Sequence, residues 1–291
     1  PMGKEVILEE MGSTGRKWFK CIWGYMEMRK KELLIIIPAY NEGENIQKVL
    51  RQIEGLEIDG KGISALADIL VINDASRDST SWRVKEMQYP MISQPYNMGY
   101  GSALQTGYKY AVRRGYSYVI QMDGDGQHDV CNVPVLYHKL KEADEEGRCP
   151  DIVLGGRFME GSAQFPVSVP KKIVYALFRS LIFLATKERI SDPTTGLQGL
   201  SRKAFLYYSK YNQFDDKYPD ANMLILMLLI RFKVVEVPAV MHARTEGKSM
   251  HSGLKPFWYM LRVIYSTLII LFRVKVLKMD EGVGLKSADK I

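Results

Sequence analysis

The sequence predicts an α/β fold with a Rossmann-like, mostly parallel central sheet flanked by helices. The first observation is a set of three mainly apolar runs, Leu33–Pro38, Ala67–Asp74 and Tyr116–Asp123. The second is that segments with helical spacing lie between them, an alternation typical of a parallel sheet. The third is that each run ends in polar residues, which places polar side chains at the carboxyl ends of the strands.

The elements can be justified in chain order. LLIIIP at residues 33–38 is a continuous apolar run that a proline stops, so we expect a strand buried on both faces. The next segment, Asn41–Ile53, has apolar residues spaced for one helix face. After the second strand we expect a turn and short helix over Ser76–Val84, and a longer helix over Gly101–Arg114.

The pattern changes after a fourth expected strand, Asp151–Phe158. We then expect a long apolar segment interrupted by basic residues at Lys171–Glu188, and a glycine-containing loop leading to a strand or short helix at Asp192–Phe205. After these we expect an apolar helix at Tyr218–Arg231, a late strand at Phe232–Val240 and a final hydrophobic helix at Phe257–Phe272.

Composition narrows the class of protein. The chain has 291 residues and a net charge of +7, from 40 basic and 33 acidic residues, which suits one large domain or two small ones. Its three distant cysteines, Cys21, Cys131 and Cys149, argue against a disulfide framework or a structural zinc site. Residues 1–31 carry many charges and no long apolar core, so we expect no secretory signal there. From Arg244 to Lys278 basic residues mix with aromatic and aliphatic ones, which favours a membrane surface and argues against a nucleic-acid partner.

Polar clusters follow the first three strands, at Pro38–Glu42, Asn73–Asp74 and Asp123–Asp125. Ligands of open α/β sheets bind outside the carboxyl ends of the strands. We therefore expect the three clusters to meet in one crevice.

The segment QMDGDGQHD holds several carboxylates that repel one another unless a positive partner lies between them. A calcium-binding EF-hand would need glycine and glutamate where, counting from Asp123, His128 and Pro134 stand. A dinucleotide-binding G-x-G-x-x-G loop would need glycine at Asp129. The interpretation that remains is Mg²⁺ or Mn²⁺ held by Asp123 and Asp125 against the diphosphate of a nucleotide-sugar.

Four motifs together resemble family 2 glycosyltransferases, which have the GT-A fold. They are PAYNE at 38–42, VINDASRDST at 71–80, NMGYGSALQTG at 97–107 and MDGDGQHD at 122–129. The branch that the chain resembles most includes dolichyl-phosphate mannose synthase and bacterial enzymes acting on polyprenyl carriers. We accordingly expect an N-terminal extension of uncertain role (1–31), a GT-A catalytic domain (32–250) and a basic, hydrophobic C-terminal helix and tail (251–291).

The resemblance implies donor-binding residues in these motifs. Those that would contact the nucleoside are Pro38, Tyr40, Glu42 and Asp74. The metal and diphosphate would be held by Asp123 and Asp125, with Gln127 as a third contact.

The resemblance also implies phosphate contacts further along the chain. Arg157 in GGRF would face phosphate, and Arg244 and Lys248 would close over the diphosphate. Lys171 and Lys172 would meet the acceptor phosphate or headgroup.

Simpler interpretations of several of these residues stay open. Tyr40 would fit core packing, and Arg157 would fit an ion pair with a nearby acid. His128 is more typical of a structural histidine than of a metal ligand. Lys171 and Lys172 would fit a solvated helix start.

A general base would be needed only for some acceptors. Family members that deprotonate a sugar hydroxyl commonly place an aspartate before an apolar helix, which here is Asp220. Asp220 would also suit the N-cap of the helix that follows. A phosphate acceptor is already anionic and needs no base. The presence of Asp220 therefore leaves both a phosphate and a sugar hydroxyl open as acceptors.

The C-terminal region predicts membrane contact. Pro256–Phe272 is short for a span and contains Arg262, so we expect a helix lying in the interface. Lys171–Lys187 is a second candidate. Ordinary core helices are the alternative for both segments.

Together these observations predict a metal-dependent, inverting glycosyltransferase with Mg²⁺ or Mn²⁺ as cofactor. It would move a sugar from a nucleotide-diphosphate sugar, with UDP favoured, to a polyprenyl phosphate or a polyprenyl-diphosphate-linked glycan in cell-envelope synthesis. We expect peripheral attachment to the cytoplasmic face of the membrane and leave homo-oligomer formation open. The alternatives are a GDP-mannose transferase like dolichyl-phosphate mannose synthase, a nucleotidyltransferase, and a non-catalytic nucleotide-sugar-binding subunit.

Overall fold

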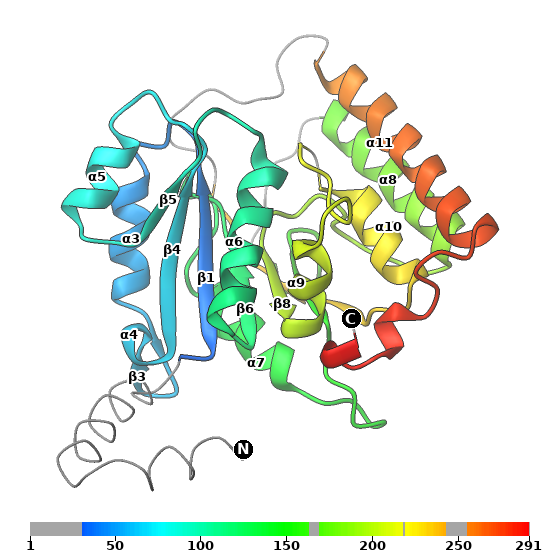
Figure 1. The fold of residues 1–291 in the computed structure, drawn as a ribbon, viewed down its shortest axis with the longest axis horizontal. Helices are drawn as coiled ribbons and strands as arrows, with labels where there is room; N and C mark the ends of the chain where they lie inside the picture. The colour runs from blue at the N-terminus through cyan, green and yellow to red at the C-terminus, as the bar shows by residue number, and fades with distance from the viewer. Residues whose placement is uncertain (1–30, 163–168, 218, 243–254, 291) are drawn as a thin grey trace, which may run out of the picture. The chain divides into compact units, whose positions relative to one another are not determined.

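Seven strands form one sheet in the order β5-β4-β1-β6-β8-β7-β9 in the computed structural model (Figure 1). The structure describes residues 31–162, 169–217, 219–242 and 255–290. All strands of this sheet point the same way except β8, which pairs antiparallel with β6 and β7. The strands are β1 (Leu33–Ala39), β4 (Ala67–Asn73), β5 (Met91–Ser93), β6 (Tyr118–Gln121), β7 (Ile152–Gly156), β8 (Gln198–Ser201) and β9 (Val234–Pro238). The predicted mostly parallel α/β sheet is therefore confirmed.

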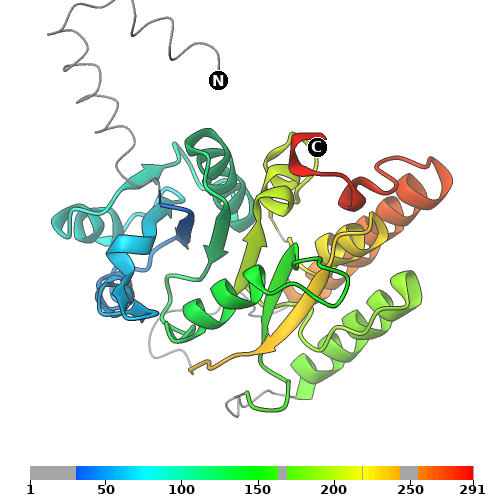
Figure 2. The ribbon, with the colours of Figure 1, turned by 90° about the horizontal axis from the view of Figure 1, so that it is seen from below.

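Helices cover both faces of this sheet. They are α3 (Ile46–Glu54), α4 (Ile63–Leu66), α5 (Thr80–Glu86), α6 (Tyr100–Arg114), α7 (Asn132–Lys141), α8 (Val169–Thr186), α9 (Arg202–Ser209), α10 (Ala221–Leu229) and α11 (Lys255–Leu271). A short hairpin, β2 (Glu57–Ile58) and β3 (Lys61–Gly62), lies outside the main sheet. In Figure 2, α6 (teal) and α9 (yellow-green) lie on the opposite side of the sheet from α7 (green).

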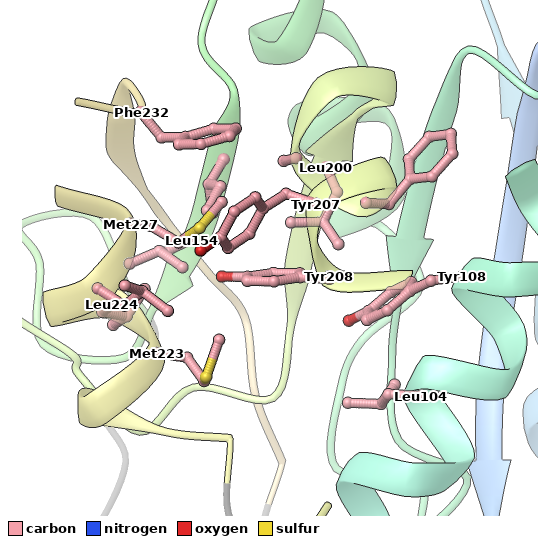
Figure 3. Packing of buried hydrophobic residues seen from close by; sticks show 14 of the residues in the cluster. Leu104, Tyr108, Leu154, Leu200, Tyr207, Tyr208, Met223, Leu224, Met227 and Phe232 are labelled. Carbon is pink, nitrogen blue, oxygen red and sulfur yellow. The ribbon is translucent and has the colours of Figure 1, made fainter. Parts of the chain in front are cut away.

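Strand β1 shows why the fold buries a continuous apolar run. Its seven residues are all buried, because successive side chains enter two different layers. Leu34 and Ile36 join the cluster of α6, α9 and α10, part of which is shown in Figure 3. Leu33, Ile35 and Ile37 join the second cluster, with residues of α3 and α7.

Pro38 lies inside β1, one residue before its end, although the sequence predicted that it would stop the strand. The Ile36 carbonyl accepts from Met122, on the β6 side, and the Ala39 carbonyl accepts from Asp74, on the β4 side. By this alternation the nitrogen of Pro38 faces the β6 side, where pairing has ended at Ile36. The next bond of this parallel ladder would need an N–H at residue 38, which proline lacks, so pairing with β6 ends at Ile36 while pairing with β4 continues to Ala39.

Helices α8 and α11 both pack against α10. Their inward residues belong to the core; examples are Phe178 and Ile182 in α8 and Val263 and Ile270 in α11. Other large apolar residues of the same helices are exposed. Among the described helices, none combines the length and hydrophobicity that a membrane span needs.

Candidate active site

The loops after β1 and β4 are bound to each other at the carboxyl edge of the sheet. Asn41 donates its backbone N–H to Ser76 Oγ (3.0 Å) and accepts from the N–H of Arg77 (2.8 Å). Gly43 donates its N–H to Asp78 Oδ2 (2.9 Å), and a Cβ atom at Gly43 would lie 2.4 Å from Ser79 Oγ. Glycine at this position therefore allows the two predicted nucleoside loops to touch.

Two predicted nucleoside contacts lie in the loop after β1. Tyr40 is 42% exposed, so core packing does not account for it. Glu42 is partly buried, and its Oε2 accepts a hydrogen bond from Asn45 Nδ2 (2.9 Å). The loop therefore leaves the Tyr40 ring accessible and uses the glutamate to shape the start of α3.

Asp74 is buried and bound to the segment that precedes α6. Its Oδ1 accepts the N–H of Met98 (2.7 Å), and its Oδ2 accepts the N–H of Gly99 (3.0 Å). Gly99 has φ +102°, a conformation that other residues rarely adopt. The predicted nucleoside acid thus also fixes the start of α6.

Asp123 lies just beyond β6, and residues from three other segments surround it. Its Oδ1 accepts from the hydroxyl of Tyr100 (2.9 Å). Its backbone N–H donates to Nδ1 of the buried His128 (3.0 Å), whose Nε2 lies 3.7 Å from Asp123 Oδ2. A Cβ atom built on Gly196 would lie 2.8 Å from Oδ2. His128 therefore supports the turn, as the structural interpretation expected.

The rest of the acidic turn is held against the end of β9. Asp125 Oδ1 accepts the N–H of Gln127 (3.0 Å), and the Gln127 carbonyl accepts the N–H of His242 (2.7 Å). His242 Nε2 lies 2.7 Å from Asp129 Oδ2. Burial opposes the charge of Asp129, but hydrogen bonds from Cys131 and His242 hold its pKa below the ordinary value. Asp129 therefore stabilises the turn through His242 and Cys131 and is separate in role from the predicted metal pair, Asp123 and Asp125.

The donor set fits a cation that is shared with a substrate. Within the described ranges, no three His, Cys, Asp or Glu side chains are grouped so that they could hold a metal ion. Mg²⁺ is usually held by one or two carboxylates, with phosphate oxygens and waters completing its shell. Asp123 and Asp125, both partly exposed, match that arrangement and do not form a closed protein site.

Arg157 is paired with an acid that the sequence did not single out. Asp192 is fully buried and accepts from Nε and from one terminal nitrogen of Arg157, both at 2.7 Å. Thr194 Oγ1 accepts from the same guanidinium at 2.8 Å. Burial disfavours the charge, but the hydrogen bonds to Asp192 raise the pKa of Arg157 above its ordinary value. Arg157 therefore forms the ion pair with a nearby acid that was its simpler interpretation, and Asp192 is that acid.

The other predicted phosphate contacts are only partly described. Arg244 and Lys248 lie outside the described residues. Lys171 and Lys172 lie at the start of α8. The structure describes the side chain of Lys172, which is exposed, but not that of Lys171.

Asp220 occupies the N-cap position of α10, as predicted, but its side chain makes no capping hydrogen bond. Its backbone N–H donates to Asn222 Oδ1 (3.0 Å). Burial first, and then the carboxylates of Asp123 and, more weakly, Asp220, raise the pKa of Tyr100 well above its ordinary value.

Two residues of the site, Tyr100 and Gly196, were not predicted. Tyr100 stands inside the motif NMGYGSALQTG, where the aromatic residue among glycines was the available signal. Gly196 carries no signal of its own in the sequence. Its role depends on a contact between segments that are distant in the chain.

The chain is similar to known proteins over most of its length. The family model described as "Glycosyl transferase family 2" matches residues 34–208. A dolichol-phosphate mannosyltransferase of Pyrococcus furiosus is 31% identical over 240 residues, covering 79% of this chain and 62% of that protein. A dolichyl-phosphate beta-glucosyltransferase of Trichomonas vaginalis is 26% identical over 227 residues, covering 75% and 66%. The chain thus spans less than two thirds of the length of either relative.

The fold is also similar to that of solved structures. Glucosyl-3-phosphoglycerate synthase from Mycobacterium tuberculosis, in complex with Mn²⁺, UDP-glucose and phosphoglyceric acid, superposes with a TM-score of 0.60. The identity is 21%, and the match covers 83% of this chain and 80% of that one. At this identity the similarity concerns the fold.

Proposed function

The chain belongs to glycosyl transferase family 2, and from that membership we propose that it transfers a sugar from a nucleotide-sugar to the phosphate of a polyprenyl-type lipid. The observation that carries the proposal is the pair Asp123 and Asp125 at the carboxyl end of β6, beside the joined loops after β1 and β4. This is where an α/β sheet binds its ligand. Among the described residues, no third His, Cys, Asp or Glu joins these two carboxylates, which suits a cation whose shell a diphosphate completes.

The donor is proposed to be a UDP-sugar, with a GDP-sugar as the alternative. A UDP-N-acetylglucosamine–dolichyl-phosphate N-acetylglucosaminyltransferase of Methanococcus voltae is 23% identical over 80% of this chain and 96% of that protein. A second structure of the mycobacterial glucosyl-3-phosphoglycerate synthase contains Mn²⁺ and UDP. The similarity to a mannosyltransferase keeps GDP-mannose in consideration. Tyr40 and Asp74, on the joined loops, are the residues that we assign to the nucleoside.

The acceptor is proposed to be a phosphate, since the names of the P. furiosus, T. vaginalis and M. voltae relatives all contain dolichol phosphate or dolichyl phosphate. An oxygen of the acceptor phosphate attacks the anomeric carbon, and the bond from that carbon to the donor diphosphate breaks. The diphosphate leaves with the electron pair, and the configuration at the anomeric carbon is inverted. Because the attacking oxygen is already anionic, no side chain has to remove a proton.

The chain's own residues prepare this displacement. A bound Mg²⁺ or Mn²⁺ would supply positive charge beside the departing diphosphate. Asp123 and Asp125 would hold the cation, with Gln127 at the same turn. Lys171 and Lys172, at the start of α8, are assigned to the acceptor phosphate. For Arg157, a phosphate contact would add to the ion pair with Asp192 and would not replace it.

We also propose that α8 and α11 bind the cytoplasmic face of a membrane. Exposed apolar residues recur at helical spacing on each: Ile173, Leu177 and Leu184 in α8, and Leu261, Tyr265, Leu268 and Phe272 in and just after α11. Figure 1 shows both helices at the side of the sheet where α10 lies. Exposed basic residues stand at the ends of the two stripes: Lys172, Lys187, Arg189, Lys275 and Lys278. Apolar side chains bordered by lysine and arginine suit an anionic lipid surface.

The test is a transfer assay on vesicles that contain polyprenyl phosphate. Radiolabelled UDP-glucose, UDP-N-acetylglucosamine and GDP-mannose are each supplied with Mn²⁺, with Mg²⁺ or with a chelator. The expected product is a lipid-phosphate-linked sugar from one donor, formed only with a cation. Donor binding without turnover would identify a non-catalytic subunit, and the absence of both binding and turnover for every donor would refute the proposal.

A further inference from the structure

Tyr100 connects two acids that stand at the ends of different strands. Its hydroxyl donates to Asp123 Oδ1 at 2.9 Å, beyond β6. The two residues before it donate their backbone N–H groups to Asp74, beyond β4. The position of the phenol is therefore set by the sheet through Asp74, and the phenol in turn binds Asp123.

Gly196 completes the surroundings of the Asp123 carboxylate. A Cβ atom at this position would lie 2.8 Å from Asp123 Oδ2 and 3.0 Å from Tyr100 Oη. The Gly196 carbonyl accepts from Gln121 Nε2 (3.0 Å), so its backbone is itself fixed to β6. The carboxylate thus has a hydroxyl donor on Oδ1, and the Gly196 backbone and His128 Nε2 lie beside Oδ2.

We infer that Tyr100 is a positioning residue that orients the Asp123 carboxylate toward the divalent cation, an inference that rests on the proposed function. Oδ1 is bound to the phenol, and His128 Nε2, at 3.7 Å, is beyond hydrogen-bond distance of Oδ2, so Oδ2 is the oxygen that we assign to the metal and the diphosphate. Hydrogen bonds to a ligating carboxylate fix its orientation, and removing such a partner typically weakens metal binding by about 10–100-fold.

The experiment measures Mn²⁺ affinity directly, by the loss of the free-ion electron paramagnetic resonance signal, at a fixed concentration of UDP or of GDP. Tyr100→Phe keeps the ring and removes only the hydroxyl. We expect the apparent Kd for Mn²⁺ to rise about tenfold or more, while the melting temperature without metal is unchanged. Tyr110→Phe, in the same helix and stacked on Tyr116, is the matched control and should bind Mn²⁺ like the wild type.

A second variant protects the test against a folding defect. Gly196→Ala introduces a methyl group against Asp123 Oδ2 and Tyr100 Oη, so we expect it to weaken Mn²⁺ binding as well. If Gly196→Ala weakens binding and Tyr100→Phe does not, the phenol has no positioning role. If the wild type fails to bind Mn²⁺ both in the presence of UDP and in the presence of GDP, the metal-dependent function itself is wrong and the inference falls with it. Equal binding by wild type and Tyr100→Phe overturns the inference alone.

Discussion

Gly101 lies directly against the backbone of Asp215, so that a Cβ atom on the glycine would be 1.9 Å from the Asp215 carbonyl oxygen. The next residue of α6, Ser102, donates its N–H to the Asp216 carbonyl (2.8 Å). The loop that leads to Asp220 is therefore seated on the first turn of α6, the turn that begins with Tyr100. This contact links Tyr100, and through it Asp123, to the segment of the candidate base.

Gly101→Ala should lower stability and activity together. The backbone carbonyl cannot rotate away as a flexible side chain would, and overpacking of this kind costs about 1–3 kcal/mol. Urea unfolding measures the loss. Gly62→Ala is the control, because the nearest atom to its Cβ is 4.0 Å away and its φ of −57° suits alanine. Equal stability of the two variants would contradict the described packing.

Asp192→Ala should be strongly destabilising. Asp192 is fully buried and Arg157 is 13% exposed, so the substitution leaves a buried charge without its carboxylate. Breaking such a pair costs about 3–5 kcal/mol, whereas an exposed pair contributes little. Glu281→Ala, which removes the exposed partner of Lys278, is the control. A double variant, Arg157→Met with Asp192→Leu, should recover part of the loss in chemical unfolding. A loss for Asp192→Ala no larger than that for Glu281→Ala would show that the pair is not buried in solution.

Asp220→Asn should keep transfer to polyprenyl phosphate within about tenfold of the wild type, because a general base contributes about 10²–10⁴-fold only where a proton must be removed. The same variant should lose activity on a polyprenyl-diphosphate-linked glycan, if that glycan is accepted at all. The measurement is the turnover number with each acceptor. A loss above 100-fold with the phosphate acceptor would assign Asp220 a role in the proposed reaction itself.

Leu184→Glu and Leu268→Glu should each weaken binding to anionic vesicles. Both side chains are exposed in the described fold, so stability should change little. Burying a leucine in an apolar phase contributes about 1.5–3 kcal/mol, so its loss corresponds to about tenfold or more in the vesicle partition coefficient. Tyr211→Glu, on a residue that is 86% exposed and outside both helices, is the control. Flotation that is unchanged in the two leucine variants would remove these helices from the membrane contact.

The strands that build the site could be predicted from the sequence because buried parallel strands are continuous apolar runs. Leu33–Ala39 and Ala67–Asn73 show this pattern directly. The reversed strand β8 could not be recognised in the same way, since QGLS is only four residues long and has no clear periodicity. Its direction depends on pairing with β6 and β7, which are distant in the chain.

Candidate site residues were predictable where they follow a strand, as Asp74 and Asp123 do. Their partners were not, because Tyr100 and Gly196 meet Asp123 only in the folded chain. Asp192 was passed over for the same reason: its pairing with Arg157 spans 35 residues of sequence. At Asp220 the N-cap position was predictable, but the direction of the side chain, which makes no capping hydrogen bond, was not.

The central claim is tested most directly by measuring sugar transfer to polyprenyl phosphate by the wild type and by Asp125→Ala, with saturating Mn²⁺ and the donor that the wild type uses. Because the cation supplies several kcal/mol of charge stabilisation, we predict a loss of about 100-fold or more in Asp125→Ala. Asp289→Ala, at an exposed position near the C-terminus, should match the wild type. Transfer by Asp125→Ala at the wild-type rate, or transfer by the wild type that persists in excess chelator, would contradict a metal-dependent glycosyltransferase centred on Asp123 and Asp125.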